Sequence, residues 1–150
     1  MIKKHHVTLL FIALAFFYPS HHSIGASSKE SGITIEIKEA WIRYPIEGTM
    51  STSLYFQIYN SSLKTDYLIK VESDIADSVQ INKTVRYNGI LKTIEVEKVA
   101  LPSKTEVKFE PMGIYLLIND FKEKITKGTK IKFKLIFANS SPLYHYALVK

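Results

Sequence analysis

Few residues of this 150-residue chain could carry out catalysis or bind a soft metal ion. It contains no cysteine, five histidines and three methionines, and four of the histidines lie within the first 22 residues. The rest of the chain keeps His145, Met50 and Met112. The absence of cysteine excludes Cys–His catalysis, and no nucleophile-elbow motif indicates a Ser-His-Asp triad. We therefore expect no enzyme, and these three side chains could form a substitute metal site only if they converged.

The first 26 residues have the pattern of a secretory signal peptide. Lys3 and Lys4 supply the positive start, Val7 to Tyr18 form an apolar run of twelve residues, and Pro19 ends it. Residues 24–26 (Ile-Gly-Ala) offer a small-residue cleavage site. The run is shorter than the ~20 residues that a membrane-spanning helix needs. We therefore expect a cleaved leader, residues 1–26, and an exported domain, residues 27–150. An uncleaved N-terminal membrane anchor is the alternative.

The absence of cysteine also bears on where the exported domain works. A domain without cysteine has no disulfide and no thiolate metal site. A domain of this size can fold without such a staple. These features favour the periplasm of a bacterium as the location.

The remainder of the chain reads as short strands separated by turns. Ile33–Lys38 and Thr129–Phe137 alternate apolar and polar residues with the period of two that a half-buried strand shows. Asn88-Gly89 between two β-prone runs predicts a tight hairpin, because both residues tolerate positive φ. Glu72–Asp77 and Leu101–Ser103 read as connecting segments. About eight strands and no amphipathic helix predict an all-β sandwich.

The strands also carry a family resemblance. The segment Glu39–Arg43, with Trp41 at its centre, is similar to the D-A-W-A-R segment near the start of the PCuAC family of periplasmic copper chaperones. The stretch Ser78–Ile118 resembles the same family in its frame of apolar, glycine and proline positions. These positions are Val79, Ile81, Gly89, Ile94–Val96, Pro102, Val107, Pro111, Gly113 and Tyr115. The resemblance spans about residues 33–137 and implies a cupredoxin-like, Ig-like β-sandwich.

The resemblance also identifies a site. The family's metal motif is His-x10-Met-x21-His-x-Met, a donor set suited to Cu(I). Its four positions fall without a gap on Asn82, Thr93, Tyr115 and Leu117. The first three offer hard oxygen donors, and Leu117 offers no donor. We therefore expect no Cu(I) at this site, and a hydrogen bond between Tyr115 and Asn82. No cofactor is expected unless Cu(I) binds through these unusual ligands.

Lysines form the other notable feature. Lys83 and Lys92 flank the altered positions and would repel a cation if their side chains point the same way. A second group lies toward the C-terminus and consists of Lys122, Lys124, Lys127, Lys130, Lys132 and Lys134. This group reads first as a solvated strand face that discourages edge-to-edge aggregation. The alternative is a docking patch for an anionic lipid surface or an acidic protein.

The resemblance implies a role in copper handling. The family task would be Cu(I) delivery during respiratory oxidase assembly, with an oxidase subunit or another copper-assembly protein as partner. The alternative is a metal-free periplasmic binding or assembly module that docks an anionic partner or a membrane surface through its lysine-rich strand. Nucleic acid is not an expected partner, because the exported domain has no recognition motif.

Overall fold

A computed structural model describes residues 35–150, all of which lie within one compact unit, Ser31–Lys150. The expected leader, residues 1–26, and the start of the first expected strand lie outside the described residues. The strands are β1 (Ile35–Ile42), β2 (Ser51–Asn60), β3 (Asp66–Glu72), β4 (Ala76–Tyr87), β5 (Ile90–Glu95), β6 (Val99–Leu101), β7 (Thr105–Phe109), β8 (Ile114–Phe121), β9 (Lys130–Phe137) and β10 (Leu143–Val149). The expected all-β class is confirmed, with ten strands in the described region rather than about eight. Among residues 35–150 there is no helix long and apolar enough to cross a membrane.

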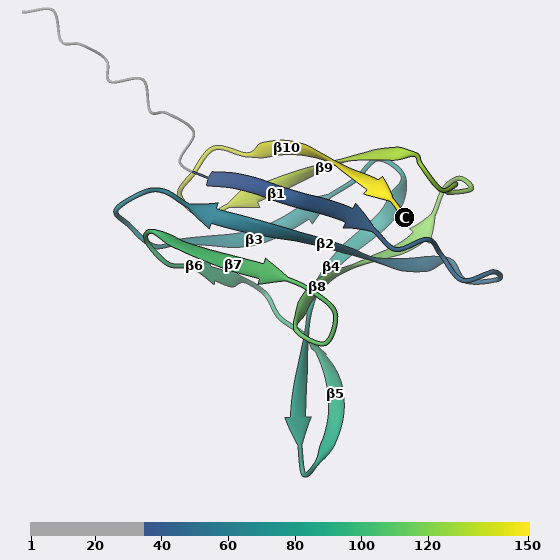
Figure 1. Ribbon diagram of the computed structural model, residues 1–150, viewed down its shortest axis with the longest axis horizontal. Coiled ribbons are helices and arrows are strands. Elements are labelled where there is room, and N and C mark those ends of the chain that lie inside the picture. Colours follow the sequence, from purple (N-terminus) through teal and green to yellow (C-terminus); the bar gives the residue numbers. More distant parts are fainter. Residues whose placement is uncertain (1–34) are drawn as a thin grey trace, which may run out of the picture. The chain divides into compact units, whose positions relative to one another are not determined.

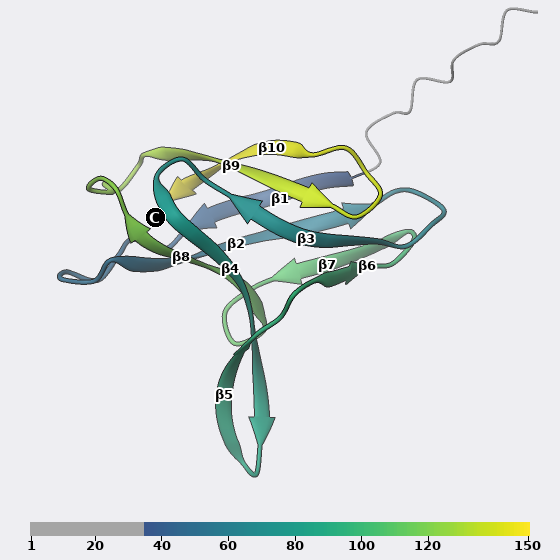
Figure 2. The same ribbon diagram turned by 180° about the vertical axis from the view of Figure 1, so that it is seen from behind.

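The strands form one hydrogen-bonded sheet that folds over on itself. Their order is β5-β4-β8-β7-β2-β1-β10-β9-β3-β6, and β8 also pairs with β2. The first and last described strands, β1 and β10, run parallel, with Trp41 opposite Leu148. Figures 1 and 2 show β10 continuing the sheet beside β1, and β9 and β3 on the opposite side of the molecule from β1 and β2. This arrangement is the expected sandwich.

The core follows from the alternation of side chains along each strand. In β2, Leu54, Phe56 and Ile58 point inward and are almost fully buried. The Phe56 ring stacks on Phe109 of β7 at 4.3 Å and lies 6.1 Å from Phe133 of β9, so it joins both halves of the sheet. The inward residues expected from the alternation in β9, Ile131, Phe133 and Leu135, are confirmed as buried, and Phe137 is buried as well.

Two connecting segments differ from expectation. The segment around Leu101 was expected to be a loop, but Val99 to Leu101 form β6, which pairs with β3. Val99 and Leu101 are buried, and the Asn60 side-chain amide donates to the Leu101 carbonyl at 2.8 Å. The acidic segment before β4 ends earlier than expected, because Ala76 is already buried and paired with Phe121. Burial of a few apolar residues therefore decides both boundaries.

One buried carboxylate ties two connections together. Asp66, at the start of β3, is 4% exposed and accepts hydrogen bonds from the backbone amides of Tyr67, Asn139 and Ser140 at 2.7, 3.0 and 2.9 Å. The Asn139 side chain adds a fourth at 3.1 Å. Burial alone would raise the pKa of Asp66, but these hydrogen bonds outweigh it and hold the pKa below its ordinary value of 3.8. The carboxylate thus fixes the β9–β10 turn against β3.

The hairpin of β4 and β5 is the one that the sequence predicts. Tyr87 pairs with Ile90, which leaves Asn88 and Gly89 as a two-residue turn. Both have positive φ, 47° and 78°, as a type I′ turn requires. In both ribbon views the hairpin extends away from the remaining strands (Figures 1 and 2).

Candidate functional site

Strands β4, β5 and β8 place the four substituted positions on one face of the sheet. Asn82 lies directly opposite Tyr115 of β8, and Leu117 follows two residues after Tyr115. Thr93 of β5 lies opposite Thr84, which is two residues after Asn82 on β4. Side chains two apart on a strand, and those directly opposite across a pair, share a face. This face is the outer one, because the intervening residue Leu116 points into the core.

The contact within the site differs from the one expected. The hydroxyl groups of Thr93 and Tyr115 lie 3.4 Å apart, within hydrogen-bonding distance. No side-chain hydrogen bond joins Tyr115 to Asn82 in this described part of the chain, although the two residues are direct partners in the β4–β8 ladder. The expected hydrogen bond between the Tyr115 and Asn82 side chains is therefore wrong, and Thr93 is the side-chain partner of the phenol. Asn82 is only 4% exposed, so its amide is enclosed by its neighbours on this face.

A carboxylate lies beside these positions that reasoning from the family motif missed. Glu95 of β5 pairs directly with Asn82. Its carboxylate accepts a hydrogen bond from the Gln80 amide at 3.3 Å, and Gln80 in turn accepts one from Asn119 at 3.1 Å. The site therefore holds an oxygen-rich row with one negative charge. The signal was present in the sequence, because Glu95 follows Thr93 by two residues on the same strand.

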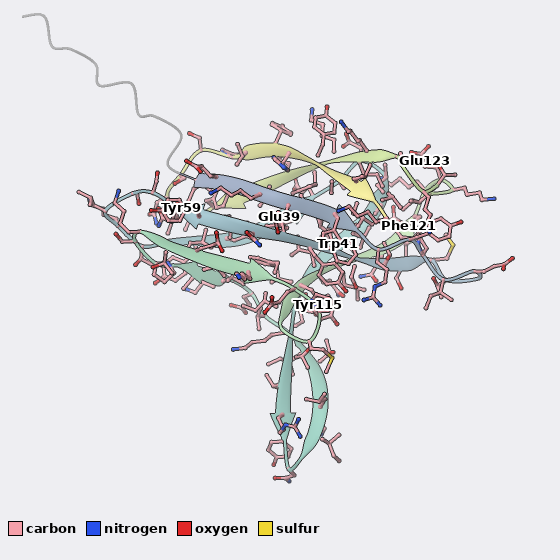
Figure 3. The ribbon with its side chains drawn as sticks, in the orientation of Figure 1. Glu39, Trp41, Tyr59, Tyr115, Phe121 and Glu123 are labelled. Carbon is pink, nitrogen blue, oxygen red and sulfur yellow. The ribbon has the colours of Figure 1, made fainter. Side chains whose placement is uncertain are left out.

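Aromatic rings border the other side of the site. The Tyr115 ring lies 6.4 Å from Tyr55, and Tyr55 lies 4.5 Å from Trp41. The Arg43 guanidinium sits 5.8 Å from the Tyr55 ring. Figure 3 shows Tyr115 where the β4–β5 hairpin leaves the other strands, with Trp41 on the neighbouring part of β1. An open depression of about 320 Å³ lies here, and its lining includes Tyr55, Thr93, Met112 and Tyr115.

The two flanking lysines do not face the site. Lys83 pairs with Ile94 and Lys92 pairs with Val85, so both lie on the opposite face of the hairpin from Asn82 and Thr93. The condition on which they were expected to repel a cation, that their side chains point toward the site, is therefore not met. The Lys92 ammonium lies instead 5.3 Å from the centre of the Tyr87 ring.

The structure does not bring together Met50, Met112 and His145. Met50 precedes Ser51, which pairs with Asn119 near the end of β8, and it lines a separate depression of about 640 Å³ between the β1–β2 and β8–β9 connections. Met112 lies at the other end of β8, just before Ile114. His145 lies on β10 with its ring 5.9 Å from Phe133, and burial lowers its pKa below the ordinary value. The weak substitute site proposed for these three has no support in their placement.

The C-terminal lysines lie on two surfaces. Lys130, Lys132 and Lys134 alternate with the buried residues of β9 and so occupy its outer face. Lys122 and Lys124 line the larger depression. Several already have partners: Lys134 pairs with Glu72 at 3.6 Å, Lys122 pairs with Asp77 at 3.8 Å, and Lys132 and Lys127 lie over Tyr144 and Tyr44. A docking role for this group stays a prediction.

The chemistry available at the site is that of neutral oxygen donors and one carboxylate. Neither sulfur nor imidazole comes from the four family positions, whereas Cu(I) prefers these softer ligands. Within residues 35–150, no group of three or more His, Cys, Asp or Glu side chains is arranged to hold a metal ion. A hydrogen-bonded polar patch is the arrangement that the geometry supports.

Comparisons with known proteins agree with this fold. The family model described as "Putative lipoprotein LpqE-like" matches residues 35–145. The uncharacterized protein RP573 of Rickettsia prowazekii (strain Madrid E) is 24% identical over 111 residues, covering 71% of this chain and 61% of that relative. This chain therefore spans less than two thirds of the relative's length.

Two solved structures confirm the expected resemblance to PCuAC domains and the cupredoxin-like sandwich. The copper-bound PCuAC domain from PmoF2 has a TM-score of 0.67 and 26% identity, over 78% of this chain and 92% of that domain. The Cu(I) form of DR1885 from Deinococcus radiodurans has a TM-score of 0.64 and 17% identity, over 83% of this chain and 85% of that one. At such low identity, the second likeness is one of fold.

Proposed function

This chain belongs to the LpqE-like family, and we propose that it is a PCuAC-type copper-chaperone homologue whose family metal position does not bind Cu(I). In this proposal the protein acts without catalysis, outside the cytoplasm and in the periplasm. The description of its family as lipoproteins supports an exported, envelope-associated location. The expected leader at residues 1–26 supports export as well.

The observation that carries the proposal is the juxtaposition of four substituted positions on one face of β4, β5 and β8. Their common face means that ligands at these positions could converge on one ion, as the family motif requires. The residues present give that ion little to bind: Thr93 and Tyr115 satisfy each other at 3.4 Å, and Leu117 has no donor. A soft monovalent copper ion gains little from an amide, a hydroxyl and a phenol.

The partners of the copper pathway are retained in this proposal. The protein serves as an accessory that contacts a respiratory oxidase subunit or another copper-assembly protein without itself carrying the ion. The outer face around Tyr55, Trp41 and Met112 keeps an aromatic and apolar border beside the site, which supports a role in contact with another protein.

A competition titration tests the metal part of this proposal. The exported chain, residues 27–150, is titrated with Cu(I) against a chromophoric chelator, beside the variant N82H/T93M/Y115H/L117M. We expect the wild type to leave Cu(I) with the chelator and the fourfold variant to remove it. The half variants N82H/T93M and Y115H/L117M are matched controls, and each should bind more weakly than the full set, because Cu(I) sites of this kind need three or four converging ligands. Tight binding by the wild type would overturn the proposal.

A further inference from the structure

The β4–β5 hairpin continues beyond the part of the sheet that supports it. The last ladder pair between β4 and β8 joins Lys83 to Ile114, and the Thr84 amide still donates to the Gly113 carbonyl at 2.9 Å. The three residues from Val85 to Tyr87 run on with only β5 beside them. At the usual strand rise this extension measures about 10 Å. Every residue of β5 is exposed. Within the described residues, nothing packs against the distal part of this hairpin as a third strand.

The end of the hairpin is apolar on both faces. Tyr87 and Ile90 face each other beside the turn and are 62% and 63% exposed. Leu91 lies on the opposite face, across from Arg86, and is 45% exposed. Large apolar side chains clustered in water are costly, and such clusters mark surfaces that contact something else. Because the apolar groups lie on both faces, a partner that covers one face would leave the other in water.

Positive charge lies directly behind this apolar tip, again on both faces. On one face, Arg86 donates to the Gly89 carbonyl at 3.2 Å, and on the other, the Lys92 ammonium lies 5.3 Å from the Tyr87 ring. Lys83 lies further back on the same face as Lys92. Across residues 82–96, Glu95 supplies the single carboxylate, and it lies at the base, where it bonds Gln80.

We propose that this hairpin docks the protein on an anionic lipid surface. The side chains of Tyr87, Ile90 and Leu91 enter the boundary between headgroups and acyl chains, and Arg86 and Lys92 meet the headgroup phosphates. A fluid lipid layer surrounds the tip on all sides and so covers both of its apolar faces, which one face of a protein partner does not. The hydrogen bond from Arg86 to the Gly89 carbonyl lowers the cost of inserting the turn, because that carbonyl already has a donor.

Vesicle co-sedimentation tests this proposal with a chain that starts at residue 27, because the apolar run of residues 7–18 would itself bind lipid. This chain contains the whole compact unit Ser31–Lys150. The probes are vesicles of phosphatidylcholine with phosphatidylglycerol, and vesicles of phosphatidylcholine alone. We expect binding to the anionic vesicles, weakened by salt. The variant I90S/L91S should lower the partition coefficient by about tenfold or more, and R86Q/K92Q by about fivefold for each charge removed.

Two control variants separate this site from other surfaces. I46S/L63S removes two exposed apolar side chains from loops outside the hairpin, and K130Q/K132Q removes charge from the outer face of β9. Both should bind anionic vesicles as the wild type does. Equal binding by I90S/L91S and the wild type, loss of binding in K130Q/K132Q instead, or no binding by the wild type would each overturn the proposal. Self-association of the protein through the hairpin tip, seen as sedimentation without binding to vesicles, would overturn the proposal as well. Because Cu(I) affinity is not measured here, failure of this proposal leaves the proposed function untouched.

Discussion

Replacing Asp66 with asparagine is a sharp test of what fixes the β9–β10 turn against β3. The carboxylate accepts three backbone hydrogen bonds and one side-chain hydrogen bond, from Tyr67, Asn139 and Ser140. An asparagine at this position has one carbonyl oxygen and one NH2 group. The N–H groups that donate to one carboxylate oxygen of Asp66 would therefore face the NH2 group, which is itself a donor. A hydrogen bond to a charged group is worth about 1.5–3 kcal/mol, and the remaining bonds weaken with the charge. We therefore expect D66N to lower the free energy of unfolding by about 2–4 kcal/mol.

Urea unfolding and thermal melting measure this change. For a domain of this size, the expected loss corresponds to a decrease in Tm of about 10 °C. The exposed Asp74, substituted as D74N, is the matched control and should change the free energy of unfolding by less than about 0.5 kcal/mol. A D66N variant as stable as D74N at neutral pH would refute the reasoning, because it would mean that the β9–β10 turn is held by other contacts.

The pH dependence of the same variant gives a second check. Because the pKa of folded Asp66 lies below its ordinary value of 3.8, the unfolded chain takes up the proton more readily than the folded one. The stability that the carboxylate contributes is therefore complete above that ordinary value and is lost as the pH falls through the folded pKa. The difference in unfolding free energy between wild type and D66N should shrink as the solution is acidified from about pH 6 to pH 3. A constant difference across this range would contradict the assigned role.

Three other predictions concern the core, the hairpin and the histidine. F56A should lower the free energy of unfolding in urea by about 3–5 kcal/mol, because it removes the ring stacked on Phe109. A decrease below about 1 kcal/mol would contradict the central place of Phe56 in the core. G89A should weaken the β4–β5 hairpin by about 1 kcal/mol, since its φ of 78° disfavours a side chain, and amide hydrogen exchange should show this in the hairpin and not at Ile58. Because burial lowers the pKa of His145 below its ordinary value of 6.5, the free energy of unfolding should decrease as the pH falls below 6.5. H145Q should flatten this part of the pH profile measured by urea unfolding. An unchanged profile would contradict the role assigned to His145.

Much of the fold is readable from the sequence where a local rule decides it. The Asn88-Gly89 turn is one such case, and the alternation that buries Phe133 and Leu135 in β9 is another. Strand β6 was missed because three residues, Val99 to Leu101, are too few to show a period. Its existence depends on pairing with β3, which lies far away in the chain. A long-range contact of this kind leaves no local signal.

The site was partly readable in the same way. Once Asn88-Gly89 is a two-residue turn, counting back along both strands pairs Asn82 with Glu95, and it places Lys83 and Lys92 on the other face. Both features follow from the sequence once the turn is known, but the family motif does not include position 95 and so gives no signal for the carboxylate. The register between β4 and β8 could not be predicted, because β5, β6 and β7 intervene in the chain and the packed core sets that register. The contact between Thr93 and Tyr115 depends on it.

The alternation along β8 has a consequence for how such a protein changes over generations. Leu116 and Ile118 point inward and are buried in the core, whereas Tyr115 and Leu117 alternate with them on the outer face, at two of the four family positions. A substitution at either outward position alters what the surface can bind while leaving the packing instructions intact. Core positions and surface positions thus alternate residue by residue along one strand. Single substitutions can change the surface positions while the core positions stay the same.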